Sequence, residues 1–175
     1  MPHRIDMRRR HEFRRIWKQA LADSTFKTVN ELSRMLRSRD ADSRLYALFQ
    51  MRSQIGRKPL KAYFSLAELL IDDPDNDCRW QAIIVVGEYV SSNPSDVWQV
   101  VVKYGNSDDS DMRTAVATVL LEHLLEYHFL KFFPRVKRES AKSPLFADTL
   151  ERCSPFGQAK RNWRKVESLL KQVRV

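Results

Sequence analysis

The sequence predicts an all-α fold in which helical pairs stack in series, a short right-handed α-solenoid of about three to four pairs closed by a C-terminal capping helix. Three observations predict it: a motif repeated at a fixed interval, apolar positions spaced by four residues after each copy, and a shortage of turn-forming residues. Of the 175 residues, 43% are hydrophobic, whereas 4 are glycine and 7 are proline. Such a chain can bury a continuous helical core and has few sites for hairpins.

The repeated motif is D-x-D-x-R, which begins at Asp40, Asp75 and Asp109, so the copies lie 35 and then 34 residues apart. A period of this length is typical of helical repeat proteins. An aspartate at a helix start accepts bonds from free amide groups and complements the helix dipole. Columns of aspartate and arginine in neighbouring repeats are expected to form a ladder of ion pairs. The members of this structural ladder are Asp42, Arg44, Asp77, Arg79, Asp111 and Arg113.

Three apolar columns follow each copy at intervals of four residues, which places them on one helical stripe. They are Ala47, Ala82 and Val116; Met51, Val86 and Leu120; and Ile55, Val90 and Leu124. Pro59 and Pro94 then start a second helix in the first two copies. The second helices carry an aromatic column, expected in the core, of Tyr63, Trp98 and Phe132. In the third copy His128 replaces the proline, so we expect a displaced or shortened second helix.

We interpret residues 1–175 as a single repeat domain with an atypical N-terminal repeat or cap at 1–39, three repeats at 40–139 and a C-terminal cap at 140–175. Terminal units of a solenoid are atypical because each covers an exposed end of the core. The first helix is predicted to present an apolar face made of Phe13, Ile16, Trp17 and Ala20. The last helix is predicted to do so with Trp163, Val166, Leu170 and Val173.

The Asp and Arg positions at the start of each first helix, the helical pairs and the period together resemble HEAT repeats over residues 40–139. This resemblance implies a binding or scaffold module, and it leaves the partner open because the fold hosts many roles. The segment from Arg79 to Val90, followed by Asn93-Pro94, is similar in texture to the HEAT-like DNA glycosylases that excise alkylated bases. That weaker resemblance implies Asp77 and Trp80 as the first residues to mutate, but the aromatic–aspartate cluster of those enzymes has no counterpart, so we assign no catalytic residues.

The formal net charge of +9 is unevenly distributed. Residues 1–39 carry 11 Lys/Arg against 4 Asp/Glu, residues 71–130 carry 3 against 11, and residues 131–175 carry 12 against 4. A basic helix is either a solvated face or a phosphate-binding surface, and the sequence leaves both open. Trp80 is the candidate contact aromatic. The candidate partner-binding or anion-binding cations are Arg8, Arg9, Arg10, Arg14, Arg15, Lys18, Lys131, Arg135, Arg138, Lys160, Arg161, Arg164 and Lys165.

Two stretches resemble metal sites only superficially, and we predict neither a metal nor a cofactor. The segment Asp73 to Asp77 is rich in carboxylates, but a calcium loop needs glycine and glutamate where Cys78 and Ile84 stand. His123 and His128 are five residues apart, so they do not share a helix face as zinc-binding histidines do.

Three functions remain open: a scaffold for a protein partner, which we prefer; a nucleic-acid-binding module that contacts phosphates; and a glycosylase. No small-molecule substrate is indicated, and the oligomeric state is undetermined. The sequence has no apolar run of membrane-spanning length and no CxxC motif, so we expect a cytoplasmic protein without membrane association and with reduced thiols.

Overall fold

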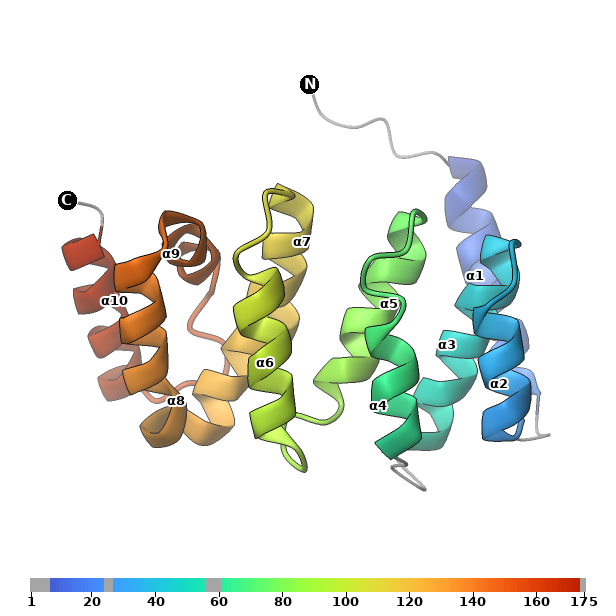
Figure 1. Ribbon diagram of the computed structural model, residues 1–175, viewed down its shortest axis with the longest axis horizontal. Coiled ribbons are helices and arrows are strands. Elements are labelled where there is room, and N and C mark those ends of the chain that lie inside the picture. Colours follow the sequence, from blue (N-terminus) through green and yellow to red (C-terminus); the bar gives the residue numbers. More distant parts are fainter. Residues whose placement is uncertain (1–6, 24–26, 56–60, 174–175) are drawn as a thin grey trace. The chain divides into compact units, whose positions relative to one another are not determined.

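The computed structural model describes residues 7–23, 27–55 and 61–173, and all regular structure in these ranges is helical (Figure 1). The predicted all-α class is therefore confirmed for this part of the chain. The chain forms two compact units, residues 1–85 and residues 86–175, which we call unit 1 and unit 2.

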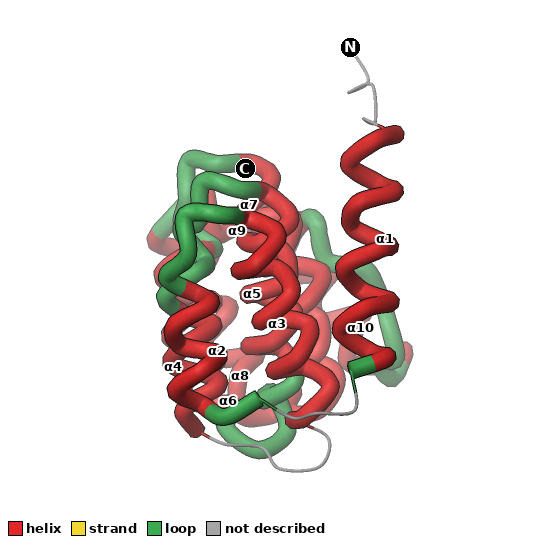
Figure 2. The backbone as a smooth tube through the Cα atoms, turned by 90° about the vertical axis from the view of Figure 1, so that its right-hand side faces the viewer, coloured by secondary structure: helices red, strands yellow, loops and turns green. Residues whose placement is uncertain are grey.

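Unit 1 is built around its third helix. It contains α1 (Met7–Ala22), α2 (Val29–Leu36), α3 (Ala41–Ile55), α4 (Lys61–Glu68) and most of α5 (Asn76–Gly87). Helix α3 packs against α1, α2 and α4, and Figure 2 shows α1 standing beside α3. The rings of Phe13 and Phe49 meet edge to face at 5.2 Å, and the Gln50 amide donates to the carbonyl of Ala20. These contacts fix α1 along α3.

The predicted apolar columns form the core of both units. Each of their nine members is at most 6% exposed. The aromatic column is also buried, with Tyr63, Trp98 and Phe132 at most 4% exposed, and in unit 2 the Trp98 and Phe132 rings lie 5.5 Å apart. The terminal helices differ from the prediction. Trp17 is 43% exposed, because the buried stripe of α1 consists of Ile16 and Ala20. In the last helix the buried residues are Val166 and Leu169, whereas Trp163, Leu170 and Val173 are only half-buried.

Unit 2 contains α6 (Pro94–Tyr104), α7 (Ser110–Ala115), a π-helical segment η1 (Val116–Leu121), α8 (Glu122–Lys142), α9 (Pro144–Glu151) and α10 (Lys160–Val173). The segment η1 packs against α6 and α9, and α8 packs against α6, α9 and α10. As the sequence indicates, Pro94 lies in the first turn of α6, and α9 starts at Pro144 with Ser143 as its N-cap. The turn at Pro59 falls outside the described residues.

The third repeat differs from the expectation for its second helix. Helices α7, η1 and α8 follow one another without a loop from residue 110 to residue 142, and the direction changes at His128, which has non-helical φ and ψ of −134° and 35°. The His128 ring bonds to the Val90 carbonyl at 3.0 Å. The second helix is therefore not shortened: a kink replaces the loop because neither glycine nor proline interrupts the chain there.

The first aspartate of each D-x-D-x-R copy caps a helix. Asp40 accepts bonds from the amides of Asp42 and Ser43 at the start of α3. Asp75 and Asp109 do the same for α5 and α7. Bonds from the Ser43 hydroxyl and amide hold the pKa of Asp40 below its usual value. The repeated motif thus marks the three helix starts because its first carboxylate satisfies amides that the helix leaves unpaired.

Both cysteines are buried free thiols, and burial raises the pKa of Cys78 to about 12. Within the described ranges, every helix is too short or too polar to cross a lipid bilayer.

Candidate functional site

Arg9 is the centre of an ion-pair cluster in unit 1. Its guanidinium donates to Asp77 at 2.7 Å, to Asp75 at 2.8 Å and to Asp42 at 3.0 Å. Burial by itself would lower the pKa of Arg9, but Asp75 and Asp77 hold it above its usual value. The cluster joins α1 to the N-terminal ends of α3 and α5. Arg9, which the sequence suggested as a ligand for an external anion, is therefore already paired with carboxylates of the protein.

The other predicted cations of α1 divide into two groups. Arg15 reaches Asp42 at 3.4 Å, with 63% of its side chain exposed. Arg10, Arg14 and Lys18 are exposed and form no ion pair with the described residues. Arg8 belongs to α1, but its side chain lies outside the described part. Some of the cations of α1 therefore form ion pairs within unit 1 itself.

Two arginines of the repeated motif make matching sets of bonds. Arg44 donates to the carbonyls of Ser38 and Arg39 and to both carboxylate oxygens of Asp73, at 2.7 and 2.8 Å. In unit 2, Arg113 donates to the carbonyls of Ser107 and Asp108, which precede it by the same intervals, and to Asp148 at 2.7 Å. Each arginine thus closes the turn before its own helix and pairs with an aspartate from a later segment.

The burial of the two pairs differs. The side chains of Arg44 and Asp73 are 10% and 4% exposed, whereas that of Asp148 is 40% exposed. Arg152 also donates to Asp148, and bonds from Arg152 and Arg113 keep the pKa of that carboxyl low. Sequence reasoning missed Asp73 and Asp148, because neither belongs to a repeated column.

The remaining members of the predicted set lie as follows. Arg79 donates to Asn76 at 2.6 Å, Asp111 is exposed in the first turn of α7, and Trp80 is half-buried on α5. Asp77, the carboxylate that a glycosylase mechanism would need, is bonded to Arg9.

The C-terminal basic region is the largest concentration of positive charge in unit 2. It comprises Lys131, Arg135, Lys137, Arg138 and Lys142 of α8 and Lys160, Arg161, Arg164, Lys165 and Lys171 of α10. Only two acidic residues, Glu139 and Glu167, occur within residues 131–142 and 160–171, which hold these cations. Glu139 pairs with Arg138 and Lys142, and the other eight cations form no ion pair among the described residues.

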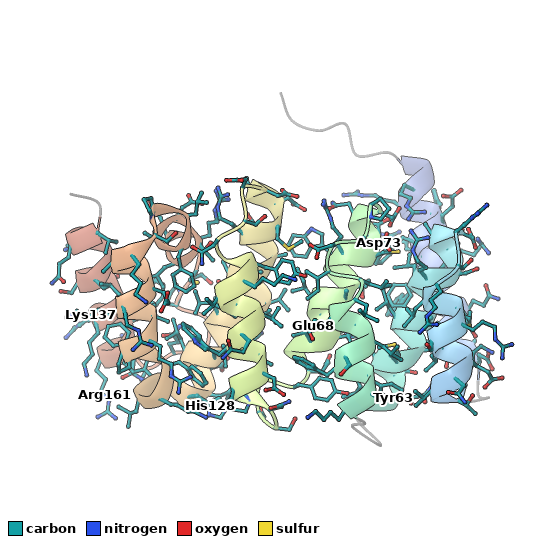
Figure 3. All side chains as sticks on the ribbon, in the orientation of Figure 1. Tyr63, Glu68, Asp73, His128, Lys137 and Arg161 are labelled. Carbon is teal, nitrogen blue, oxygen red and sulfur yellow. The ribbon has the colours of Figure 1, made fainter. Side chains whose placement is uncertain are left out.

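Helical spacing organises this region. Lys131, Arg135, Arg138 and Lys142 recur at intervals of four, three and four residues, so they form one stripe along α8. On α10, Val166 and Leu169 are buried and the basic residues occupy the opposite, exposed face. Figure 3 shows Lys137 of α8 and Arg161 of α10 on the same side of unit 2.

Aromatic rings underlie several of these cations. Lys131 and Arg135 lie over the ring of Phe132, at 5.2 and 5.3 Å from its centroid, and Lys165 lies 5.9 Å from that of Phe129. Such contacts hold a cationic side chain against the surface without removing its charge. The stems are therefore ordered, while the charged groups remain available for an external anion.

Next to this region, the first turns of α8 hold the loop between α9 and α10. Buried Glu122 accepts bonds from the amide and hydroxyl of Ser154, at 2.7 and 3.1 Å. Glu126 bonds to the His123 ring at 3.1 Å. The ring of Phe156 meets that of His123 edge to face at 5.4 Å, and the ring of Tyr127 stacks on that of His123 at 6.1 Å. The acidic and histidine residues of this stretch thus dock a loop.

Gly157 completes the docking because its φ is 64°, a left-handed conformation, and a Cβ there would collide with the Glu126 carboxylate. We expect Gly157→Ala to lower the free energy of unfolding by about 1–2 kcal/mol, the cost of this conformation for a residue with a side chain. Urea denaturation measures the change. Lys160→Ala, at an exposed residue in the first turn of α10, is the control, and an equal effect of Lys160→Ala would contradict the explanation.

Among the described residues, no group of three or more His, Cys, Asp or Glu side chains is placed to hold a metal ion. The exposed aromatic pair of Tyr127 and Phe156 was not identified from the sequence, because Phe156 lies in a loop whose position depends on a distant helix. Compared with known proteins, the chain matches no family model, and no curated protein or solved structure is significantly similar to it.

Proposed function

We propose that this protein is a non-catalytic, HEAT-like module that binds nucleic acid through the C-terminal basic region. The observation that carries the proposal is the uncompensated charge: eight of the ten cations form no ion pair among the described residues. A folded protein that only needed solubility could place acidic residues between these cations. An evenly spaced basic stripe matches instead the regular phosphates of a nucleic-acid strand.

The recurrence of local structure supports the HEAT-like part of the proposal. Arg44 and Arg113 make equivalent bonds at the starts of two different helices, and three aspartates cap helices at the repeat interval. Repeats of one supersecondary unit are expected to conserve such bonds, because each unit must close its own turn and join its neighbour.

Phosphate binding favours nucleic acid over the protein partner that the sequence alone suggested. Phosphate contacts need cations in ordered positions and no deep pocket, and the ring contacts of Lys131, Arg135 and Lys165 provide this order. We expect low sequence selectivity, because contacts to phosphates fix the position of a strand but carry no information about its bases.

The test is the salt dependence of binding by the purified protein. We expect fluorescence anisotropy to show that labelled oligonucleotides bind at 25 mM KCl, with a logarithmic salt slope of about −3 or steeper, as four or more phosphate contacts require. A protein that binds neither single-stranded nor duplex DNA or RNA at 25 mM KCl would overturn the proposal.

A protein partner remains the second candidate, and a specific observation favours it. On α1, Trp17 and Leu21 are 43% and 55% exposed, beside exposed Arg14 and Lys18. An exposed tryptophan flanked by arginine is typical of protein-binding hot spots. If this surface serves a protein, Trp17→Ala should abolish a co-purifying complex and leave nucleic-acid affinity unchanged.

A further inference from the structure

Tyr127 and Phe156 form an exposed aromatic surface at the start of the C-terminal basic region. Each is 58% exposed, although a large aromatic side chain normally buries most of its surface. Both contact His123, Tyr127 by stacking at 6.1 Å and Phe156 edge to face at 5.4 Å. We call these three residues the aromatic platform.

The platform is held rigidly from beneath. Glu122 anchors the loop through Ser154, and Glu126 bonds to His123, so both nearby carboxylates are engaged within the protein. Gly157 adopts the left-handed conformation that lets the loop pass against Glu126. The rings are therefore ordered before any ligand arrives, and binding them would require little further loss of conformational entropy.

The platform also lies beside cations that can hold phosphates. Phe156 is four residues from Lys160 and five from Arg161, so its Cα is at most about 14 Å from that of Lys160. Both cations are exposed at the first turn of α10, and neither forms an ion pair among the described residues. Exposed rings next to a basic helix are the arrangement that proteins use for unpaired bases, whose faces stack while their phosphates are neutralised.

We propose that the aromatic platform stacks unpaired bases, so that the ligand of this protein is single-stranded nucleic acid, with its phosphates on α10. This inference rests on the proposed function and deepens it. A duplex has its bases stacked on one another, so it can use only the basic residues. A single strand uses both the rings and the cations, and it should bind more tightly.

The experiment uses the full chain and two labelled probes, a 20-nucleotide oligothymidylate and a duplex of equal length. We expect the oligothymidylate to bind more tightly, and Tyr127→Ala and Phe156→Ala each to weaken its binding roughly tenfold to a hundredfold. The salt slope should not change, because neither substitution removes a cation. Duplex binding should be unaffected.

Three controls keep the result specific. Tyr127→Phe retains a ring and should retain affinity, whereas a purely structural effect of the alanine variants would appear in thermal melting followed by circular dichroism. Leu69→Ala removes a side chain that is 70% exposed in unit 1 and should change nothing.

The possible failures are distinguishable. If duplex and single strand bind equally and the alanine variants bind normally, the platform is not a stacking site, although the proposed function stands. If neither probe binds at low salt, both proposals fall. If polyglutamate competes as strongly as oligothymidylate and is indifferent to Tyr127→Ala, the region serves an acidic protein and the inference is overturned.

Discussion

Replacing Asp73 by alanine is expected to lower the free energy of unfolding by about 3–5 kcal/mol. Asp73 receives two bonds from Arg44, and the two side chains are only 4% and 10% exposed. The substitution leaves a buried guanidinium without its counter-charge, and the surrounding helices cannot admit enough water to replace it. Urea denaturation followed by circular dichroism measures the change.

The matched control is Asp148→Ala in unit 2. Arg113 holds Asp148 with the same short bond and is as buried as Arg44, each side chain being 10% exposed. Asp148, however, is 40% exposed, so water can reach the place of the lost carboxylate. Its cost is expected to be about 1 kcal/mol, as for partly exposed pairs. Equal effects of the two substitutions would show that burial does not determine the strength of these pairs.

Removing three cations from α10 is expected to produce the largest loss of binding. The triple variant Arg161→Ala, Arg164→Ala and Lys165→Ala should weaken oligothymidylate binding about a hundredfold at 0.1 M salt. The logarithmic salt slope should become less steep by about 2, because up to three phosphate contacts are lost. Anisotropy titrations at several salt concentrations measure both quantities.

A variant of equal charge separates a local effect from a general one. Arg34, Arg37 and Arg39 are exposed in unit 1, and replacing all three by alanine changes the net charge by the same amount. If this control weakens binding as much as the α10 variant, the protein attracts nucleic acid through its overall charge and the C-terminal basic region has no special role.

The helix starts and the buried helix faces were predictable because they depend on residues that lie only a few positions apart in the sequence. A capping aspartate and apolar residues at intervals of four are local properties, so Asp40, Asp75 and Asp109 mark helix starts and their downstream columns are buried. Trp17 was misplaced because its neighbours Ile16 and Ala20 suffice to bury α1, which leaves a wide side chain at the margin of the stripe.

The candidate site was less predictable, because it depends on contacts between distant segments. Arg9 looked like a surface cation and is bound by three carboxylates that lie 33 to 68 residues away. The aromatic platform requires the loop at Phe156 to reach His123, again across more than thirty residues. Local patterns report which side chains are cationic or aromatic, but not which of them remain available.

The shared use of Arg9 by Asp42, Asp75 and Asp77 has a consequence for how these positions can vary. Substitutions at the three aspartates are not energetically independent, because each one alters how strongly the same guanidinium holds the other two. Losing Arg9 itself leaves three like charges facing one another, so a later loss of one aspartate then relieves repulsion instead of breaking a bond. Substitutions in α1 and at the starts of α3 and α5 are therefore expected to depend on one another.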